Sequence, residues 1–203
     1  MATADQLVSW RGLVVMEARN GLTYMRGVRQ KVHTGAVTNP EDDASDRVRV
    51  VYEIQQNQGW PPVAEERVWA VALSDDLVRI DNIPWFIRDL ALNDLVRVVP
   101  DASSVLRPVE KISWAGNCTI RIIPYPDSGK FDSLQQVLDL FSPLGVTGEG
   151  VDQFGMVALA VPPAADLAAV KRLFGQGVEA GWWDYEEACI GGLGRACSAG
   201  VGA

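Results

Sequence analysis

The second half of the chain alternates short apolar runs with two amphipathic segments, and this pattern restricts the possible folds more than any other feature. Apolar residues recur on one helical face in both segments, and these side chains are expected to point inward: Leu134, Val137, Leu138 and Phe141 in the first and Leu167, Val170 and Phe174 in the second. Four short apolar runs, at 119–123, 146–152, 156–161 and 183–189, have the length and composition of strands. The predicted order is βαββαβ, which is that of a ferredoxin-like split βαβ unit.

Both predicted helices carry signals at their ends. Asp132 is expected to cap the first helix, because Gln135 follows three residues later as in a capping box. Asp166 is expected to cap the second helix, which spans about 165–178, and Gly175 and Gly177 should weaken its last turn.

Residues 47–112 show the period of two that is typical of strands. Apolar and polar side chains alternate from Val48 to Ile54, and further strands are predicted at 68–73, 77–80, 95–99 and 105–112. Strands this short and closely spaced predict a small, curved antiparallel sheet. We therefore expect an α+β protein in which this β half packs on the ferredoxin-like half, residues 113–190.

The two ends of the chain differ in composition from these halves. Asn20-Gly21 joins two apolar runs within residues 10–29, which is the strongest short signal for a β-hairpin. Residues 34–46 are rich in Gly, Asn, Pro, Ser and acidic side chains, as linkers are. We therefore expect a basic arm with an acidic linker over residues 1–46, and a flexible glycine-rich tail over residues 191–203.

The formal net charge of −8 is unevenly distributed along the 203 residues. Residues 1–40 carry five basic and two acidic side chains, a charge of +3, so the remaining residues carry −11. An acidic body repels phosphate backbones, which argues against nucleic-acid binding, and it attracts basic proteins. The basic arm is expected to fold back onto that body or onto a second copy, which would give a homo-oligomer.

The sequence shows neither a long apolar run nor an apolar stretch behind a basic N-terminus, so no membrane span and no signal peptide are predicted. We expect a cytoplasmic protein. Reactive constellations are also scarce: His33 is the single histidine, and Cys118, Cys189 and Cys197 have no CxxC spacing. The glycine-rich segment 145–150 lacks the Gly-Lys-Ser/Thr ending of a phosphate loop. We therefore expect no metal site and no cofactor.

The corner at residues 81–86 is the first candidate site. Asn82 and the proline after Ile83 most simply make a turn. Alternatively, Asn82 and the carboxylates of Asp81 and Asp94 could edge a pocket whose walls are Trp85 and Phe86, since ligand sites combine apolar walls with a few fixed polar groups.

Two further candidates lie in the second half. Arg121 interrupts an apolar strand, where it could lie on a sheet face turned partly to solvent, pair with an acidic neighbour across the sheet, or anchor a substrate anion. Trp182, Asp184 and Glu187 lie at the last strand, which presents either a solvated face opposite an aromatic core face or an acidic, aromatic rim for a cation.

The chain from about 48 to 190 resembles the bacterial domain-of-unknown-function family 4265. The matching pieces are Gly59-Trp60-Pro61-Pro62, Glu66 with Val68-Trp69-Ala70, Asp81-Asn82-Ile83-Pro84, Asp94-Leu95-Val96, Ser113 with Thr119-Ile120-Arg121, and Gly181-Trp182-Trp183-Asp184-Tyr185-Glu186. The resemblance implies no particular activity or cofactor.

Two functional hypotheses follow. The first is a non-enzymatic, acidic protein-interaction module, an immunity-like or regulatory partner of a basic protein, and it depends on the acidic body and the missing reactive motifs. The second is a carboxylate-dependent enzyme or small-molecule binder with a site between the two halves, in which Asp94, Asp184 and Glu187 act as acid or base and Arg121 anchors an anion.

Overall fold

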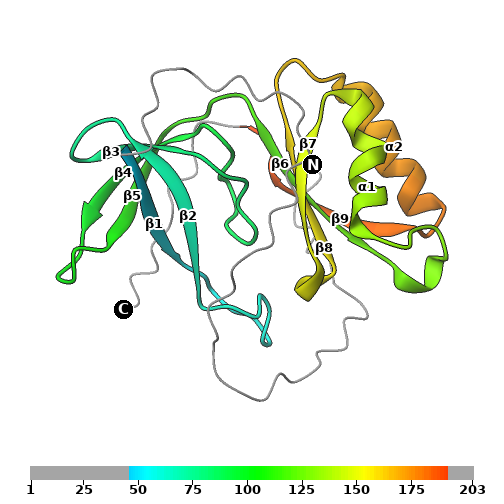
Figure 1. Cartoon of the computed structure of the whole chain (residues 1–203), viewed down its shortest axis with the longest axis horizontal. Coiled ribbons are helices and arrows are strands. Elements are labelled where there is room, and N and C mark those ends of the chain that lie inside the picture. The colour runs from blue at the N-terminus through cyan, green and yellow to red at the C-terminus, as the bar shows by residue number, and fades with distance from the viewer. Residues whose placement is uncertain (1–45, 192–203) are drawn as a thin grey trace, which may run out of the picture. The chain divides into compact units, whose positions relative to one another are not determined.

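The computed structural model describes residues 46–191. The predicted arm hairpin, most of the linker and the glycine-rich tail lie outside the described residues. The elements follow in the order β1 (Arg47–Glu53), β2 (Glu65–Ala72), β3 (Leu77–Ile80), β4 (Leu95–Pro100), β5 (Leu106–Ser113), β6 (Cys118–Pro124), α1 (Leu134–Phe141), β7 (Thr147–Val151), β8 (Met156–Val161), α2 (Leu167–Glu179) and β9 (Trp183–Cys189). Short 3-10 turns, η2 (Pro126–Ser128), η3 (Ser142–Leu144) and η4 (Asp152–Phe154), join some of them (Figure 1). Residues 46–191 thus form a mixed α/β structure with two largely antiparallel sheets.

Strands β1 to β5 form a small closed barrel. Each strand pairs antiparallel with the next one along the chain, and β1 returns to β5 through a parallel pair at Val50 and Leu106. The alternating pattern of the sequence places one set of side chains inside, where Val50, Val68, Ala70, Val78, Ile80, Val96 and Val98 are buried. The curved β half was predicted, whereas its closure into a barrel was not.

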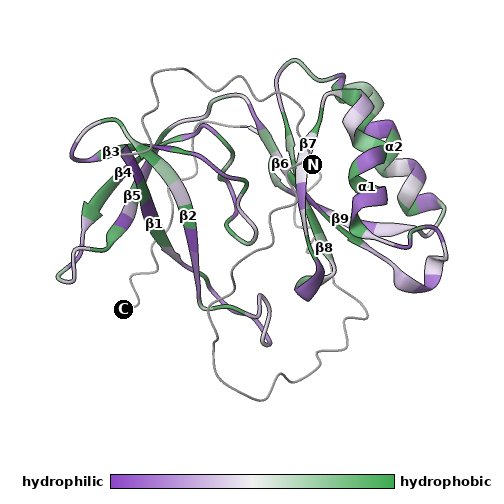
Figure 2. Ribbon diagram, viewed as in Figure 1, coloured by the Kyte–Doolittle hydropathy of each residue, from purple (hydrophilic) through white to green (hydrophobic). Residues whose placement is uncertain are grey.

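Strands β6 to β9 form a four-stranded antiparallel sheet in the order β7-β8-β6-β9. Both α-helices lie on the same face of this sheet (Figure 1). All six residues of β8 are buried, and its ribbon is apolar throughout (Figure 2). Val157 and Leu159 of β8 belong to the cluster beneath the helices, while Ala158 and Ala160 pack against Ile83. The connection between β3 and β4 therefore covers the face of β8 that the helices leave open.

The helix predictions need two corrections. Asp132 does not cap α1, because the helix begins one residue later and Ser133 holds the N-cap position. Leu167 does not point inward, because it is the first residue of α2 and 45% of its surface is exposed. The cap of α2 is confirmed, since a carboxylate oxygen of Asp166 accepts a hydrogen bond from the N–H of Ala169 at 3.0 Å.

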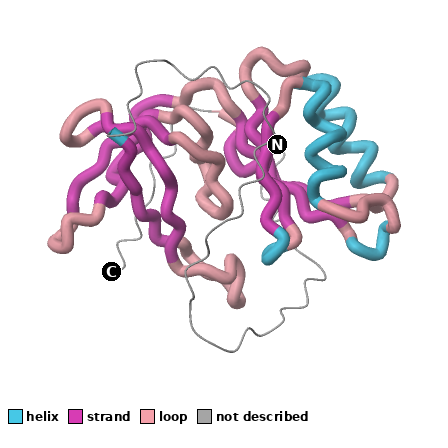
Figure 3. The backbone as a smooth tube through the Cα atoms, viewed as in Figure 1, coloured by secondary structure: helices cyan, strands magenta, loops and turns pink. Residues whose placement is uncertain are grey.

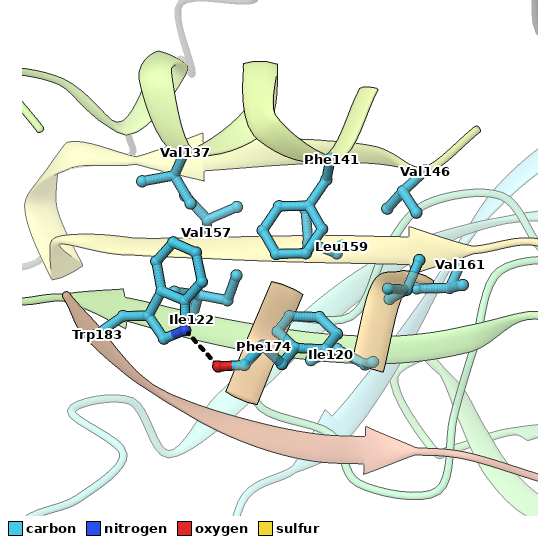
Figure 4. Packing of buried hydrophobic residues seen from close by; sticks show 11 residues of the cluster. Ile120, Ile122, Val137, Phe141, Val146, Val157, Leu159, Val161, Phe174 and Trp183 are labelled. Carbon is cyan, nitrogen blue, oxygen red and sulfur yellow. Dashed lines mark hydrogen bonds between the residues drawn. The ribbon is translucent and has the colours of Figure 1, made fainter. Parts of the chain in front are cut away.

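The core of the second half is built around Trp183 (Figure 4). Only 1% of its surface is exposed, and its indole N–H donates to the carbonyl of Phe174 at 3.3 Å. A Cβ on Gly177 would lie 2.0 Å from Cε2 of this ring. The glycine that the sequence marks as a weakness of α2 therefore gives Trp183 the space it needs.

Candidate functional site

The connection between β3 and β4, residues 81–94, carries the first group of candidate residues and is drawn as loop in Figure 3. Glu66 of β2 binds this loop through three consecutive backbone N–H groups, those of Trp85 at 2.6 Å, Phe86 at 2.8 Å and Ile87 at 3.1 Å. Glu66 is 8% exposed, and burial raises the pKa of its carboxyl although the three N–H donors and the charge of Arg121 act in the opposite direction. A buried carboxylate thus organises the loop from the barrel side.

Arg121 holds the same loop from the sheet side. Its guanidinium donates to the carbonyl of Ile87 and, at 2.8 Å, to the carboxylate of Glu186, its partner across the β6–β9 pair. Glu186 also binds the exposed Arg88 at 2.7 Å. Arg121 is 3% exposed, and burial lowers the pKa of its guanidinium while Glu186 opposes that shift. The predicted pairing of Arg121 with an acidic neighbour across the sheet is confirmed.

Asp94 lies at the end of the loop and is fully buried. Its carboxylate accepts hydrogen bonds from the N–H groups of Ala91 and Ala115, each at 3.0 Å, and lies 3.4 Å from the ammonium of Lys111. Burial raises the pKa of this carboxyl, and its donors act in the opposite direction. The carboxylate of Asp94 is therefore bound by groups of the chain itself.

Asn82 and Trp85 also have contacts within the chain. The side-chain oxygen of Asn82 accepts from the N–H of Trp69 at 2.7 Å, which ties the corner to β2. Trp85 packs beside Ile83 against the alanines of β8. The contacts of Asn82 and Trp85 therefore support the interpretation of residues 81–86 as a structural turn.

Two polar residues of the second half complete the anchoring of the loop. Thr119 is fully buried and donates to the carbonyl of Leu90 at 2.9 Å, and Asn117 donates to that of Leu92 at 3.0 Å. Together with Glu66, Asp94 and Arg121, these side chains bind the backbone of residues 85–92 and leave few loop groups for a ligand.

Trp182 and Asp184 lie elsewhere, at the end of the sheet where β6 stops and β9 begins. The Trp182 ring meets Phe131 at 6.3 Å and Trp183 at 5.8 Å, both edge to face, and the ammonium of Lys130 lies 4.3 Å from its centre. The carbonyl of Trp182 accepts from the N–H of Tyr125 at 2.8 Å. We call this surface the acidic aromatic rim; it consists of Tyr125, Asp127, Lys130, Phe131, Trp182 and Asp184.

Asp184 acts electrostatically on the rim. The pKa of Tyr125 is raised first by burial and then by the negative charge of Asp184, although 43% of the tyrosine surface is exposed. Glu187, by contrast, is exposed near the other end of β9, where its charge adds to burial in raising the pKa of the Cys118 thiol. The structure therefore places Trp182 and Asp184 on either side of one neighbour, Tyr125, and places Asp94, Arg121 and Glu187 in other surroundings.

Seven residues of these two regions escaped the sequence prediction, and Asn117, Thr119 and Asp127 are three of them. Glu66 had a usable signal, because it falls in phase with the buried Val68 and Ala70 on β2, where an acidic side chain needs partners. Tyr125, Lys130 and Phe131 had none, since their proximity to Trp182 depends on the pairing of β6 with β9.

Two observations concern the chain more broadly. Within residues 46–191, no group of three or more His, Cys, Asp and Glu side chains is placed to hold a metal ion. None of the helices in that part of the chain is long and apolar enough to span a membrane.

Comparison with known proteins agrees with this architecture. The search of curated proteins found no match. Among solved structures, the chain is similar to the crystal structure of a hypothetical protein from Neisseria gonorrhoeae, with 24% identity and a TM-score of 0.58 over 73% of this chain and 96% of the other. At this identity the similarity concerns the fold alone. The family described as "Domain of unknown function (DUF4265)" matches residues 66–185, and the chain belongs to that family.

Proposed function

We propose that this protein is a non-enzymatic, acidic interaction module that binds a basic protein, as an immunity protein or a regulatory partner does. The main support is the distribution of charge. Residues 46–112 carry eleven acidic and eight basic side chains, a formal charge of −3, whereas residues 113–191 carry ten acidic and four basic side chains, a charge of −6. The excess negative charge is therefore greater in the second part, and it would attract basic surfaces.

Ion pairs within the barrel add to this difference in charge between the two parts of the chain. Arg97 binds Glu110 at 2.6 Å and lies 3.6 Å from Asp76, and Arg107 binds both Glu65 and Asp101 at 3.1 Å. Much of the barrel's acidic charge is thus balanced locally.

The acidic aromatic rim is the surface we propose for the partner. It combines the carboxylates of Asp127 and Asp184 with partly exposed rings, and Trp182 already faces a cation. Interfaces are enriched in aromatic residues, which provide contact area, while carboxylates at the edge select basic side chains. A lysine- or arginine-bearing segment fits this chemistry.

We further propose that residues 113–190 form a ferredoxin-like half. The element order β6-α1-β7-β8-α2-β9 and the strand order β7-β8-β6-β9, with antiparallel neighbours throughout, support this assignment. Two helices on one face leave the loops at the sheet end to form a rim.

The alternative, a carboxylate-dependent enzyme, has less support. Asp94 binds two N–H groups and approaches Lys111, and Arg121 binds Glu186 and a carbonyl. Neither side chain has an arrangement that would favour a role as acid, base or anion anchor.

A deca-lysine peptide provides a direct test. Binding should be measurable by calorimetry at low salt and should weaken as salt rises, because exposed charges are screened. The double variant Asp127→Asn/Asp184→Asn should weaken binding, whereas Asp139→Asn, which removes an exposed charge from α1, should have a smaller effect. Equal effects of the two variants would contradict binding at the rim, and absence of binding at low salt would contradict the proposed function.

A further inference from the structure

The Trp182 ring has a fixed orientation and one face turned to a cation. Phe131 and Trp183 both meet it at steep interplanar angles, 85° and 74°. Phe131 is itself stacked on Trp183, with an interplanar angle of 12° and a centroid distance of 5.6 Å, and Trp183 is buried. The ring is therefore held by the core of the second half while its face remains available to a positive charge.

Lys130 lies on that face although acidic neighbours are close in sequence. Its ammonium is 4.3 Å from the ring centre, and the ion pairs found between described residues do not include this lysine. The residue is exposed, and its neighbour Phe131 packs against the core cluster. An exposed cation–π contact contributes only about 0.5–1 kcal/mol, so another cation can displace the ammonium.

We propose that Lys130 occupies, in the free protein, the position that an arginine side chain of the partner takes in the complex. This inference depends on the proposed function and specifies its chemistry. A guanidinium stacks on an aromatic face and can donate to a carboxylate at the same time, which an ammonium on a flexible stem does less well. The rim therefore selects an arginine-bearing segment and rejects weaker cations through competition with Lys130.

The test compares two lysine variants with a deca-arginine peptide as the probe. Lys130→Met removes the competing charge and keeps the length of the side chain. Lys171→Met is the matched control, because Lys171 is an exposed lysine of α2 that lies outside the rim. Lys130→Met should increase the affinity for deca-arginine by about two- to five-fold more than Lys171→Met does, as expected for the release of one exposed cation–π contact. Equal effects of the two variants would overturn the inference.

An NMR measurement on the wild-type protein tests the displacement itself. The Lys130 methylene protons next to the ammonium should resonate upfield in the free protein, because they lie over the Trp182 ring, and should move to ordinary positions when deca-arginine saturates the site. Upfield resonances that persist at saturation would overturn the inference while leaving the proposed function standing. If deca-arginine failed to bind the wild type and both variants at low salt, the proposed function would fail as well.

Discussion

Glu66 and Arg121 bind the backbone of the same residue, Ile87. The N–H of Ile87 donates to Glu66, and its carbonyl accepts from Arg121. Glu66 belongs to the barrel and Arg121 to the four-stranded sheet. The loop between β3 and β4 is thus held by opposite charges from two separate sheets.

Removal of the Glu66 carboxylate should destabilise the protein strongly. Glu66→Ala leaves the N–H groups of Trp85, Phe86 and Ile87 without their acceptor. It also removes one of the two acidic groups that act on the buried Arg121, the other being Glu186. We expect the free energy of unfolding to fall by about 3 kcal/mol or more. Urea denaturation measures this change. Glu65→Ala, at an exposed position of the same strand, should lower the free energy of unfolding by less than about 1 kcal/mol. A similar decrease in both variants would show that the hydrogen bonds of Glu66 to the loop do not stabilise the protein.

The raised pKa of Glu66 predicts a pH dependence with a definite sign. Because the folded-state pKa lies above the ordinary value of 4.5, the protonated carboxyl is favoured by folding. Its contribution to stability is complete below pH 4.5 and is lost as pH rises through the folded-state pKa. The stability advantage of the wild type over Glu66→Gln should therefore shrink as pH rises from 4.5 towards neutrality. Urea titrations at a series of pH values test this, and an advantage that grows with pH would contradict the predicted direction.

Two glycines of α2 should respond in opposite ways to alanine. Gly177→Ala places a methyl group 2.0 Å from the Trp183 ring, within buried surroundings, and should cost about 3 kcal/mol through overpacking. Gly175→Ala meets no atom within 4 Å and should stabilise the helix by up to about 1 kcal/mol. Thermal unfolding of the two variants gives the comparison. Equal melting temperatures would show that the helix moves away from Trp183 at little cost.

The hydroxyl of Thr119 provides an isosteric test of the loop anchors. Thr119→Val preserves the shape of the side chain but leaves the carbonyl of Leu90 without a buried donor, and should cost about 1–2 kcal/mol. Thr147→Val, at an exposed position of β7, should change stability by less than about 0.5 kcal/mol. Hydrogen exchange at the amides of the β3–β4 loop should also accelerate in Thr119→Val and not in Thr147→Val. Unchanged exchange in Thr119→Val would show that the hydroxyl does not anchor the loop.

The sequence predicted those parts of the fold that depend on local patterns. The strand bounds at 77–80, 156–161 and 183–189 were confirmed, because hydrophobic alternation and neighbouring turn residues fix them within a few residues. The inward side chains Val137, Phe141, Val170 and Phe174 were confirmed for the same reason. Barrel closure was missed, since it depends on β1 meeting β5 about fifty residues later, and no local pattern reports such a pairing.

For the candidate sites too, local patterns in the sequence allowed a prediction, whereas contacts between distant residues did not. An acidic partner across the sheet was one of the alternatives predicted for Arg121, and Glu186 is that partner, because a buried charge requires one. The anchoring of residues 85–92 by Glu66, Asp94, Asn117, Thr119 and Arg121 could not be predicted, because each bond joins residues that only the folded chain brings together.

The alanines of β8 have a consequence for the way the protein unfolds. Ala158 and Ala160 let the β3–β4 loop pack closely on the sheet, so residues 81–94 belong to the barrel by chain connectivity and to the sheet by packing. Neither region can lose its structure without exposing the apolar surface and the buried charges of the other. The barrel and the sheet should therefore melt together in a single cooperative transition, and a destabilising substitution in either one should lower the melting temperature of both.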